Sequence, residues 1–204
     1  YAFVVNAFVS LLKRADMTRY ELFLRETRTY EIIEDVKNFR SEIGVLFLNS
    51  YNRDVLTKMF DDNRLTYTSL FKARPHIFVS KSNPLAKHEV VSLEDLEDFP
   101  YLSYDQGIHN SFYYSEEILS QIPHKKSIVV SDRATLFNLL IGLDGYTIAT
   151  GILNSNLNGD NIVSIPLDID DEIDIVYLKH EKATLSKMGE KFLDNLVKEV
   201  TFDN

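Results

Sequence analysis

The stretch HIFVSKSNPLAKHEVVSLEDLEDFPYL, residues His76–Leu102, decides the interpretation of the fold. Its apolar beginning, His76–Ser80, predicts a strand. That strand has to end at Asn83-Pro84, because proline fixes its own φ and disfavours a helical backbone at the residue before it. A second strand is predicted over Tyr101–Tyr104, directly after Pro100.

Between these two strands, Ser92-Leu93-Glu94-Asp95 has the spacing of a helix N-cap box. The Ser92 hydroxyl can accept hydrogen bonds from free amides of the first turn, and the acidic residues favour the positive end of the helix dipole. On these residues alone, an ordinary loop and a short helix between two strands explain the stretch as well as a family motif does.

The composition is that of an ordinary globular protein. The chain has 204 residues, 45% hydrophobic and 26% charged, which suits one large domain or two small ones. It contains no cysteine, which excludes disulfides and thiolate metal sites. The formal net charge of −9 lacks the basic footprint of phosphate binding, so this segment is not expected to bind DNA by itself.

No basic segment precedes an apolar run, so we expect no signal peptide, and no apolar run is long enough for a membrane span. It begins at Tyr1 and not at a methionine, so we expect a fragment of a longer protein.

Outside the opening stretch, the apolar pattern switches repeatedly between helical and strand periodicity. Helices are predicted over Tyr1–Lys13, Thr29–Phe39, Arg53–Asp61, Ser111–Gln121, Arg133–Leu143 and Leu185–Val200. Further strands are predicted over Tyr20–Arg25, Ile43–Leu48, Leu65–Lys72, Ser127–Val130, Tyr146–Thr150, Ile162–Leu167 and Ile173–Lys179. The continuous apolar run Ile43–Leu48 is typical of a strand buried on both faces of a parallel sheet. Strands that alternate with helices indicate right-handed βαβ units and an α/β fold.

Two of the predicted helices, Tyr1–Lys13 and Arg133–Leu143, are apolar around most of their circumference. One sheet can cover only one side of a helix, so the other side needs a second cover. Deep burial within one domain and a subunit interface both supply such a cover, and we expect the interface.

Three motifs at fixed spacing resemble the effector-binding domain of LysR-type transcriptional regulators, at the point where the chain crosses between its two subdomains. The family pattern there is a strand, a His-Pro-Leu-Ala turn, a Ser-Leu-Glu-Asp-Leu helix, and a proline before a second strand. This chain has Asn83-Pro84-Leu85-Ala86, then Ser92-Leu93-Glu94-Asp95-Leu96, then Pro100-Tyr101-Leu102. Asn83 stands where the family has histidine, a change that a turn tolerates.

The resemblance implies an α/β fold of two Rossmann-like subdomains joined by two crossover strands, similar to periplasmic binding proteins. Residues 1–74 plus 173–204 would form the first subdomain and residues 75–172 the second. An N-terminal winged helix-turn-helix, outside this chain, would bind the DNA. The family dimer is antiparallel, which would set Tyr1–Lys13 against Arg133–Leu143 of the partner in a homodimer or tetramer.

Polar residues follow several predicted strands, where open α/β sheets bind ligands. The family pocket uses these strand ends, so the resemblance implies an effector site between the subdomains. Family residues that precede the first helix lie outside this sequence. Ser131 and the neighbouring Asp132 are equally suited to cap their own helix. The candidate effector-binding residues are Thr27, Asn49, Ser103, Tyr104, Asp105, Ser131, Thr150 and Gly151.

Other chemistry finds little support in the sequence. The five histidines (His76, His88, His109, His124, His180) form no metal-binding pair, and Asp168–Asp174 lacks the glycine and closing glutamate of a calcium loop. Gly142 and Gly145 do not fit a phosphate-binding loop, and no serine lies in a nucleophile elbow. We therefore expect neither an enzyme nor a cofactor.

We interpret the chain as the effector-binding and oligomerisation domain of a cytoplasmic bacterial LysR-type regulator. A small metabolite, with amino-acid or sulfur metabolism as the suggested source, would bind in the cleft. DNA would be contacted only through the absent N-terminal domain, and no membrane is involved. The alternative is a secreted or periplasmic solute-binding protein of the same two-lobed architecture, which upstream sequence would distinguish.

Overall fold

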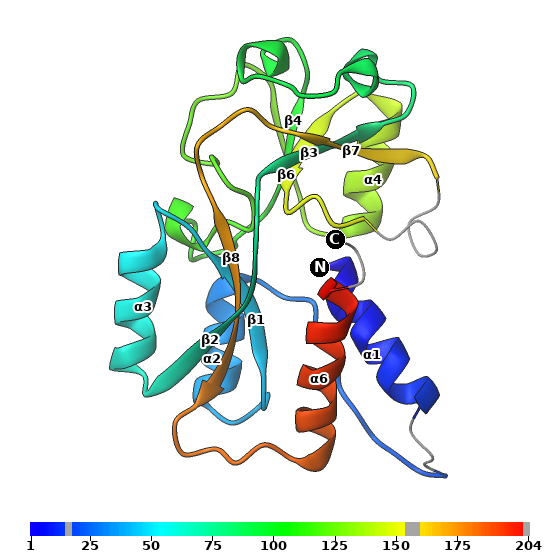
Figure 1. Cartoon of the computed structure of the whole chain (residues 1–204). Coiled ribbons are helices and arrows are strands. Elements are labelled where there is room, and N and C mark those ends of the chain that lie inside the picture. Colours follow the sequence, from blue (N-terminus) through cyan, green and yellow to red (C-terminus); the bar gives the residue numbers. More distant parts are fainter. Residues whose placement is uncertain (15–17, 154–159, 202–204) are drawn as a thin grey trace.

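The computed structural model describes residues 1–14, 18–153 and 160–201, and these contain two β-sheets placed one above the other (Figure 1). The strands are β1 (Gly44–Leu48), β2 (Leu65–Ala73), β3 (His76–Ser80), β4 (Tyr101–Tyr104), β5 (Ser127–Val130), β6 (Tyr146–Ala149), β7 (Ile162–Pro166) and β8 (Ile173–His180). The α-helices are α1 (Ala2–Arg14), α2 (Thr29–Lys37), α3 (Arg53–Asp62), α4 (Arg133–Gly142) and α6 (Lys187–Thr201).

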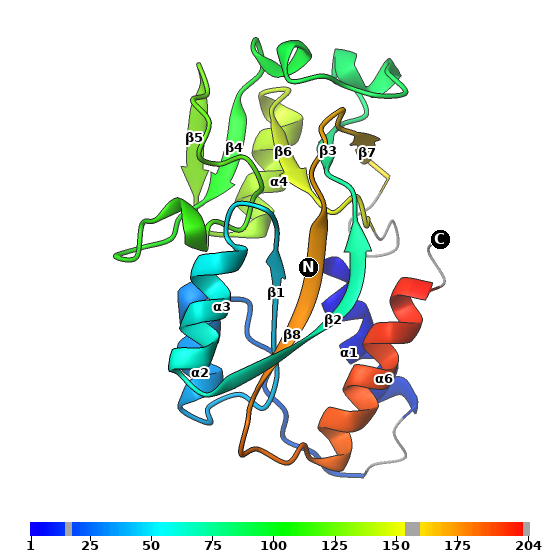
Figure 2. The same cartoon turned by 60° about the vertical axis from the view of Figure 1, so that its left-hand side comes forward.

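The first sheet has the order β1-β8-β2, and both of its strand pairs are antiparallel. The second has the order β5-β4-β6-β3-β7, in which β4 pairs in parallel with β5 and β6 while β3 pairs antiparallel with β6 and β7. The chain passes between the sheets twice, from β2 into β3 and from β7 into β8 (Figure 2). The predicted α/β fold with two crossover connections is therefore confirmed.

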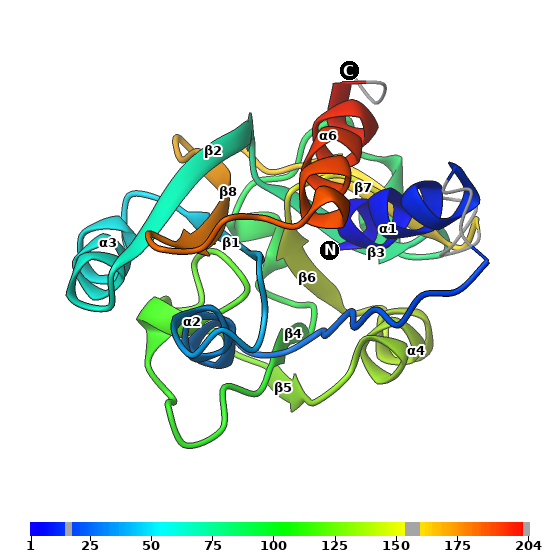
Figure 3. The same ribbon diagram turned by 90° about the horizontal axis from the view of Figure 1, so that it is seen from below.

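Helices cover the first sheet on both faces (Figure 3). On one face, Ile33 of α2 and Leu56 of α3 pack with Leu46 and Leu48 of β1. On the other face, Phe3 of α1 shares a core with Phe47 and with Leu196 of α6. In the second sheet, α4 buries Leu136 and Leu140 against Leu102 and Phe78. Each sheet thus packs its buried side chains against helices.

The turn that decides the fold is more tightly bonded than its sequence indicated. Asn83 is only 1% exposed; its Oδ1 accepts a hydrogen bond from the amide of Leu85 at 2.8 Å and its Nδ2 donates to the carbonyl of Asp144 at 2.7 Å. The predicted cap box is confirmed, because the amide of Ser92 donates to Asp95 Oδ2 at 2.9 Å and the amide of Asp95 donates to Ser92 Oγ at 3.3 Å. It closes only one 3₁₀ turn, Glu94–Leu96.

The parallel pairing expected for Ile43–Leu48 was wrong. The strand β1 pairs antiparallel with β8, and along the described part of the chain its other edge has no strand partner. A continuous apolar run reports burial on both faces, which helices on two sides produce in an antiparallel sheet as well.

The strand predicted over Tyr20–Arg25 is also absent. These residues are extended but belong to neither sheet, and Phe23 is 77% exposed. Alternation favours an extended backbone, whereas a strand also needs the edge of a neighbouring strand, which no local pattern can supply.

The helix predicted over Ser111–Gln121 is reduced to one 3₁₀ turn, Phe112–Tyr114. Its aromatic residues contact the side of the first sheet: Tyr113 stacks on Tyr51, in the turn before α3, with ring centroids 4.8 Å apart, and Tyr114 lies edge-on to Tyr30 of α2 at 5.5 Å. These contacts fix the segment in a shape that a regular helix would not allow.

Candidate functional site

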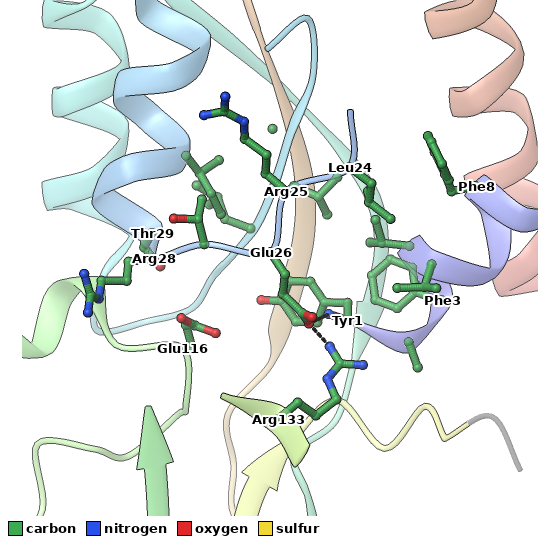
Figure 4. Close-up of a pocket in the computed structure, with 18 of the residues that line it drawn as sticks. Tyr1, Phe3, Phe8, Leu24, Arg25, Glu26, Arg28, Thr29, Glu116 and Arg133 are labelled. Carbon is green, nitrogen blue, oxygen red and sulfur yellow. Dashed lines mark hydrogen bonds and ion pairs between the residues drawn. The ribbon is translucent and has the colours of Figure 1, made fainter. Parts of the chain in front are cut away.

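A cavity of about 790 Å³ lies beside α1 and β1 and reaches the carboxyl ends of β4 and β6. Its walls along α1 are apolar and include Phe3, Phe8 and Leu11. All residues from Gly44 to Phe47 line it, so that the unpaired backbone edge of β1 faces the cavity. Toward the second sheet the walls become polar, and this region is called here the polar end (Figure 4). It is lined by Thr27, Arg28, Tyr104, Asp105, Glu116, Glu117, Ser131, Arg133 and Thr150.

Two ion pairs cross the polar end and tie the segment before α2 to the second sheet. Arg28 donates to Asp105 twice, through Nη2 to Oδ2 at 2.7 Å and through Nε to the backbone carbonyl at 3.0 Å. Arg133, the first residue of α4, pairs with Glu26 (Figure 4). The amide of Gly107 and the guanidinium of Arg28 lower the pKa of Asp105, so this carboxylate stays charged. The polar end therefore has a fixed, charged frame.

Two adjacent acids lie deeper in the same wall. Glu117 is 4% exposed, and its Oε1 accepts a hydrogen bond from the amide of Tyr104 at 2.9 Å. Burial raises the pKa of Glu117 well above its ordinary range, and the neighbouring Glu116 adds to the effect. Burial likewise raises the pKa of Glu116, whose Oε1 accepts a long contact of 3.5 Å from Gln106 Nε2. Both carboxyl groups are costly to ionise in this environment.

Aromatic stacking connects the loop after β4 to the side of the first sheet. Tyr30 of α2 stacks on His109 with ring centroids 3.4 Å apart and an interplanar angle of 17°. His109 and Tyr113 lie in the loop after β4. Tyr30 lies in α2 and Tyr51 in the turn before α3, and both helices cover the first sheet. This loop therefore bridges the sheets beside the polar end.

Five of the eight predicted effector-binding residues line the cavity: Thr27, Tyr104, Asp105, Ser131 and Thr150. Among them, Thr27 donates a short hydrogen bond to Glu31, and Ser131 leaves the capping of α4 to Asp132, whose Oδ1 accepts from the amide of Thr135 at 2.9 Å. Their role in binding stays a prediction.

The other three predicted residues do not line the cavity. The Oδ1 of Asn49 accepts from the amides of Tyr51 and Asn52, both at 3.1 Å, because the residue caps the turn before α3. Ser103 precedes Tyr104 in β4, and successive side chains of a strand point to opposite faces. Gly151 follows Thr150 with φ of 83°, and an added Cβ would lie 2.6 Å from His76 Nδ1. The backbone conformation at position 151 therefore requires glycine.

Arg28, Glu116, Glu117 and Arg133 were missed as candidates. Arg133 directly follows the polar strand end Ser131-Asp132, so its position in the sequence already indicated a candidate site residue. Glu116 and Glu117 lay inside a segment predicted as a helix, where paired acids indicate a solvated face. Only the folded loop brings them inward.

The described residues form no group of three or more metal-ligating side chains. Within that same part of the chain, no helix is both long and apolar enough to cross a membrane.

Comparisons with known proteins agree with this architecture. A family model described as "LysR substrate binding domain" matches residues 13–201. The effector-binding domain of QuiR in complex with shikimate has 17% sequence identity and a TM-score of 0.62, over 96% of this chain and 88% of that one. The BenM effector-binding domain with its effector benzoate has 18% identity and a TM-score of 0.63, over 98% and 86%. No curated protein sequence matches.

The oxidized form of OxyR from Corynebacterium glutamicum has 13% identity and a TM-score of 0.65; the match covers 98% of this chain but 61% of that one. This chain thus spans less than two thirds of the length of that OxyR chain. At these identities the likeness shows the fold alone, and the ligands named for QuiR and BenM belong to those proteins.

Proposed function

Because the chain belongs to the family of LysR substrate-binding domains, we propose that it is the effector-binding and oligomerisation domain of a LysR-type transcriptional regulator. A small metabolite binds at the polar end of the cavity and shifts one sheet relative to the other. The full-length protein is cytoplasmic and is a dimer or tetramer. In it, this shift changes how a separate domain binds DNA. Domains of this family are regulatory, so we propose no reaction for the chain.

The observation that carries the proposal is the polar end itself. It lies at the carboxyl ends of β4 and β6, where open α/β sheets bind ligands, and its frame is made of residues from both sheets' sides. A ligand that replaces one partner of the Arg28–Asp105 pair changes the contact between those sides. Such a differential contact is what a ligand needs in order to shift a conformational equilibrium.

The test is a thermal-shift screen of small metabolites on the 204-residue chain, followed by calorimetry with each compound that raises the melting temperature. Thr150 is 9% exposed and lines the cavity, so Thr150→Val should weaken effector binding by up to about tenfold, the equivalent of one hydrogen bond. Ser103→Ala is the matched control, because Ser103 lies on the neighbouring strand β4 but outside the cavity. Equal affinities for the parent and both variants would show that the effector binds elsewhere.

Control of DNA is tested separately with the full-length protein. A confirmed effector should change its footprint on DNA, and Thr150→Val should require a higher effector concentration for the same change. An effector that binds the isolated chain but leaves the footprint of the full-length protein unaltered would contradict the regulatory part of the proposal.

A further inference from the structure

The charges at the polar end do not balance. Its two arginines already have carboxylate partners: Arg133 pairs with Glu26, and Arg28 contacts both Asp105 and Glu31. Glu116 and Glu117 line the same cavity, and within the described residues neither forms a salt bridge. Two carboxyl groups therefore line the cavity without a salt-bridge partner among the described residues, although the Tyr1 α-amine and Arg133 act on Glu116 electrostatically.

Glu117 is the more demanding of the two. Its Oε1 is satisfied by the amide of Tyr104, but its Oε2 is fully buried and has no hydrogen-bond partner in the structure. Oε1 of Gln106 and the hydroxyl of Tyr101 are also buried without a partner, but neither residue lines the cavity. Buried acceptors of this kind are costly unless a donor reaches them. Glu117 thus contributes one unsatisfied acceptor to the wall of the cavity.

The orientation of Glu116 also suits contact with a ligand in the cavity. Its carboxylate points into the cavity (Figure 4). Since adjacent residues supply both groups, a donor with several N–H bonds can contact the two carboxylates together. A primary ammonium has three such donors and a positive charge that complements the two carboxylates.

We propose that the polar end binds the ammonium group of a small amino-bearing metabolite, with Glu116 and Glu117 as its carboxylate ligands. The inference rests on the proposed function and narrows the class of effector. A divalent metal ion is the less suitable cation, because the described residues offer no set of three metal-ligating side chains here.

Binding of such a ligand should be linked to pH. An ammonium ion selects the ionised carboxylates, so affinity should rise as the pH increases through their raised pKa values. In the 204-residue chain used for the test, burial lowers the pKa of the Tyr1 α-amine to about 6, so this group loses its charge as the pH rises above that value. Arg133 and Glu26, which pair with each other, also act on Glu116. Burial raises the pKa of the phenols that act on these acids, so these phenols remain neutral. These phenols belong to Tyr1, Tyr101 and Tyr104.

The experiment compares amino compounds with matched partners that lack the charge: α-amino acids, their N-acetyl derivatives and the corresponding deaminated acids. Thermal shift and calorimetry on the 204-residue chain should show binding of one or more amino compounds, and at least tenfold weaker binding of each N-acetyl partner. Affinity should rise with pH, and calorimetry in buffers of different ionisation enthalpy should show that binding releases protons.

Glu117→Gln keeps an oxygen acceptor for the amide of Tyr104 and should weaken binding of the amino compound at least tenfold. Glu116→Gln should act in the same direction, which keeps the test valid if one variant folds poorly by circular dichroism. Glu97→Gln, an exposed acid outside the cavity, is the control and should bind as the parent does.

Equal binding of the amino and N-acetyl compounds, or unchanged affinity in both glutamine variants, would overturn the inference, as would binding of none of the amino compounds. Calcium or magnesium binding that depends on Glu117 would overturn it in favour of a metal. The proposed function has its own test: an effector without an amino group whose binding depends on Thr150 would leave that function standing while the ammonium inference fails.

Discussion

Replacing Gly151 by alanine should destabilise the fold strongly, although the residue lies in a loop. Its φ of 83° is in the left-handed region, which costs an L-residue about 1–2 kcal/mol. The new Cβ would lie 2.6 Å from Nδ1 and 2.7 Å from Cγ of His76, and overlap of this kind costs roughly 1–3 kcal/mol. The two effects together predict a loss of about 2–5 kcal/mol in the free energy of unfolding.

The histidine ring cannot easily move aside. His76 Nδ1 lies 2.9 Å from the carbonyl of Arg74, and His76 is paired with Ala149 in the second sheet. Gly142 is the matched control, because an added Cβ there meets no atom within 4 Å and the residue ends helix α4. Gly142→Ala should leave stability unchanged or raise it by up to about 1 kcal/mol.

Urea denaturation followed by circular dichroism measures these differences, and a double-mutant cycle separates the two costs. In the His76→Ala background the overlap is gone, so Gly151→Ala should then cost only the about 1–2 kcal/mol of backbone strain. A Gly151→Ala loss no larger than that of Gly142→Ala would refute the reasoning. Equal losses with and without His76 would refute its steric part.

Three further predictions follow from other parts of the fold. Burial raises the folded-state pKa of Glu117, so the protein loses stability as the pH rises from the ordinary value of 4.5 through that raised pKa. Glu117→Gln should therefore raise the melting temperature at pH 7, and the gain should shrink toward pH 4.5. A gain that does not vary with pH would contradict this prediction. Asn83→Asp keeps the acceptor for the amide of Leu85 but loses the donor to Asp144, and should cost about 1–3 kcal/mol in urea denaturation, with Asn83→Ala costing more. The apolar residues Val9 and Ile141 are 36% and 44% exposed on α1 and α4, so Val9→Asp or Ile141→Asp should convert a sedimenting dimer into a folded monomer; a parent chain that is monomeric at high concentration would disprove the predicted interface.

Local sequence determined the elements whose apolar pattern is strong. Helices α2, α3 and α4 and strands β3, β4 and β5 lie within two residues of their predicted bounds, because each buries a periodic face that its own residues define. The turn at Asn83-Pro84 and the cap box at Ser92–Asp95 were readable for the same reason: proline, the amide side chain and the hydroxyl act on backbone within three residues.

Tertiary structure decided everything that depends on a distant partner. Tyr20–Arg25 has the pattern of a strand but no neighbouring edge, and β1 has antiparallel rather than parallel pairing because β8, more than 120 residues later, lies beside it. The second apolar face of α1 is partly covered within the chain, since Phe8 packs edge-on against Phe192 of α6. An apolar pattern reports how much of a helix is covered but not which segment covers it.

The residues of the polar end were likewise predictable from the sequence only in part. The strand ends pointed to Tyr104, Asp105, Ser131 and Thr150, because the carboxyl ends of neighbouring strands meet at one edge of a sheet. The sequence could not place Arg28 on Asp105, 77 residues away, or turn Glu117 inward from a segment with a helical pattern. Charged side chains are solvated by default, and only the folded loop, held by aromatic stacking on Tyr30 and Tyr51, buries Glu117.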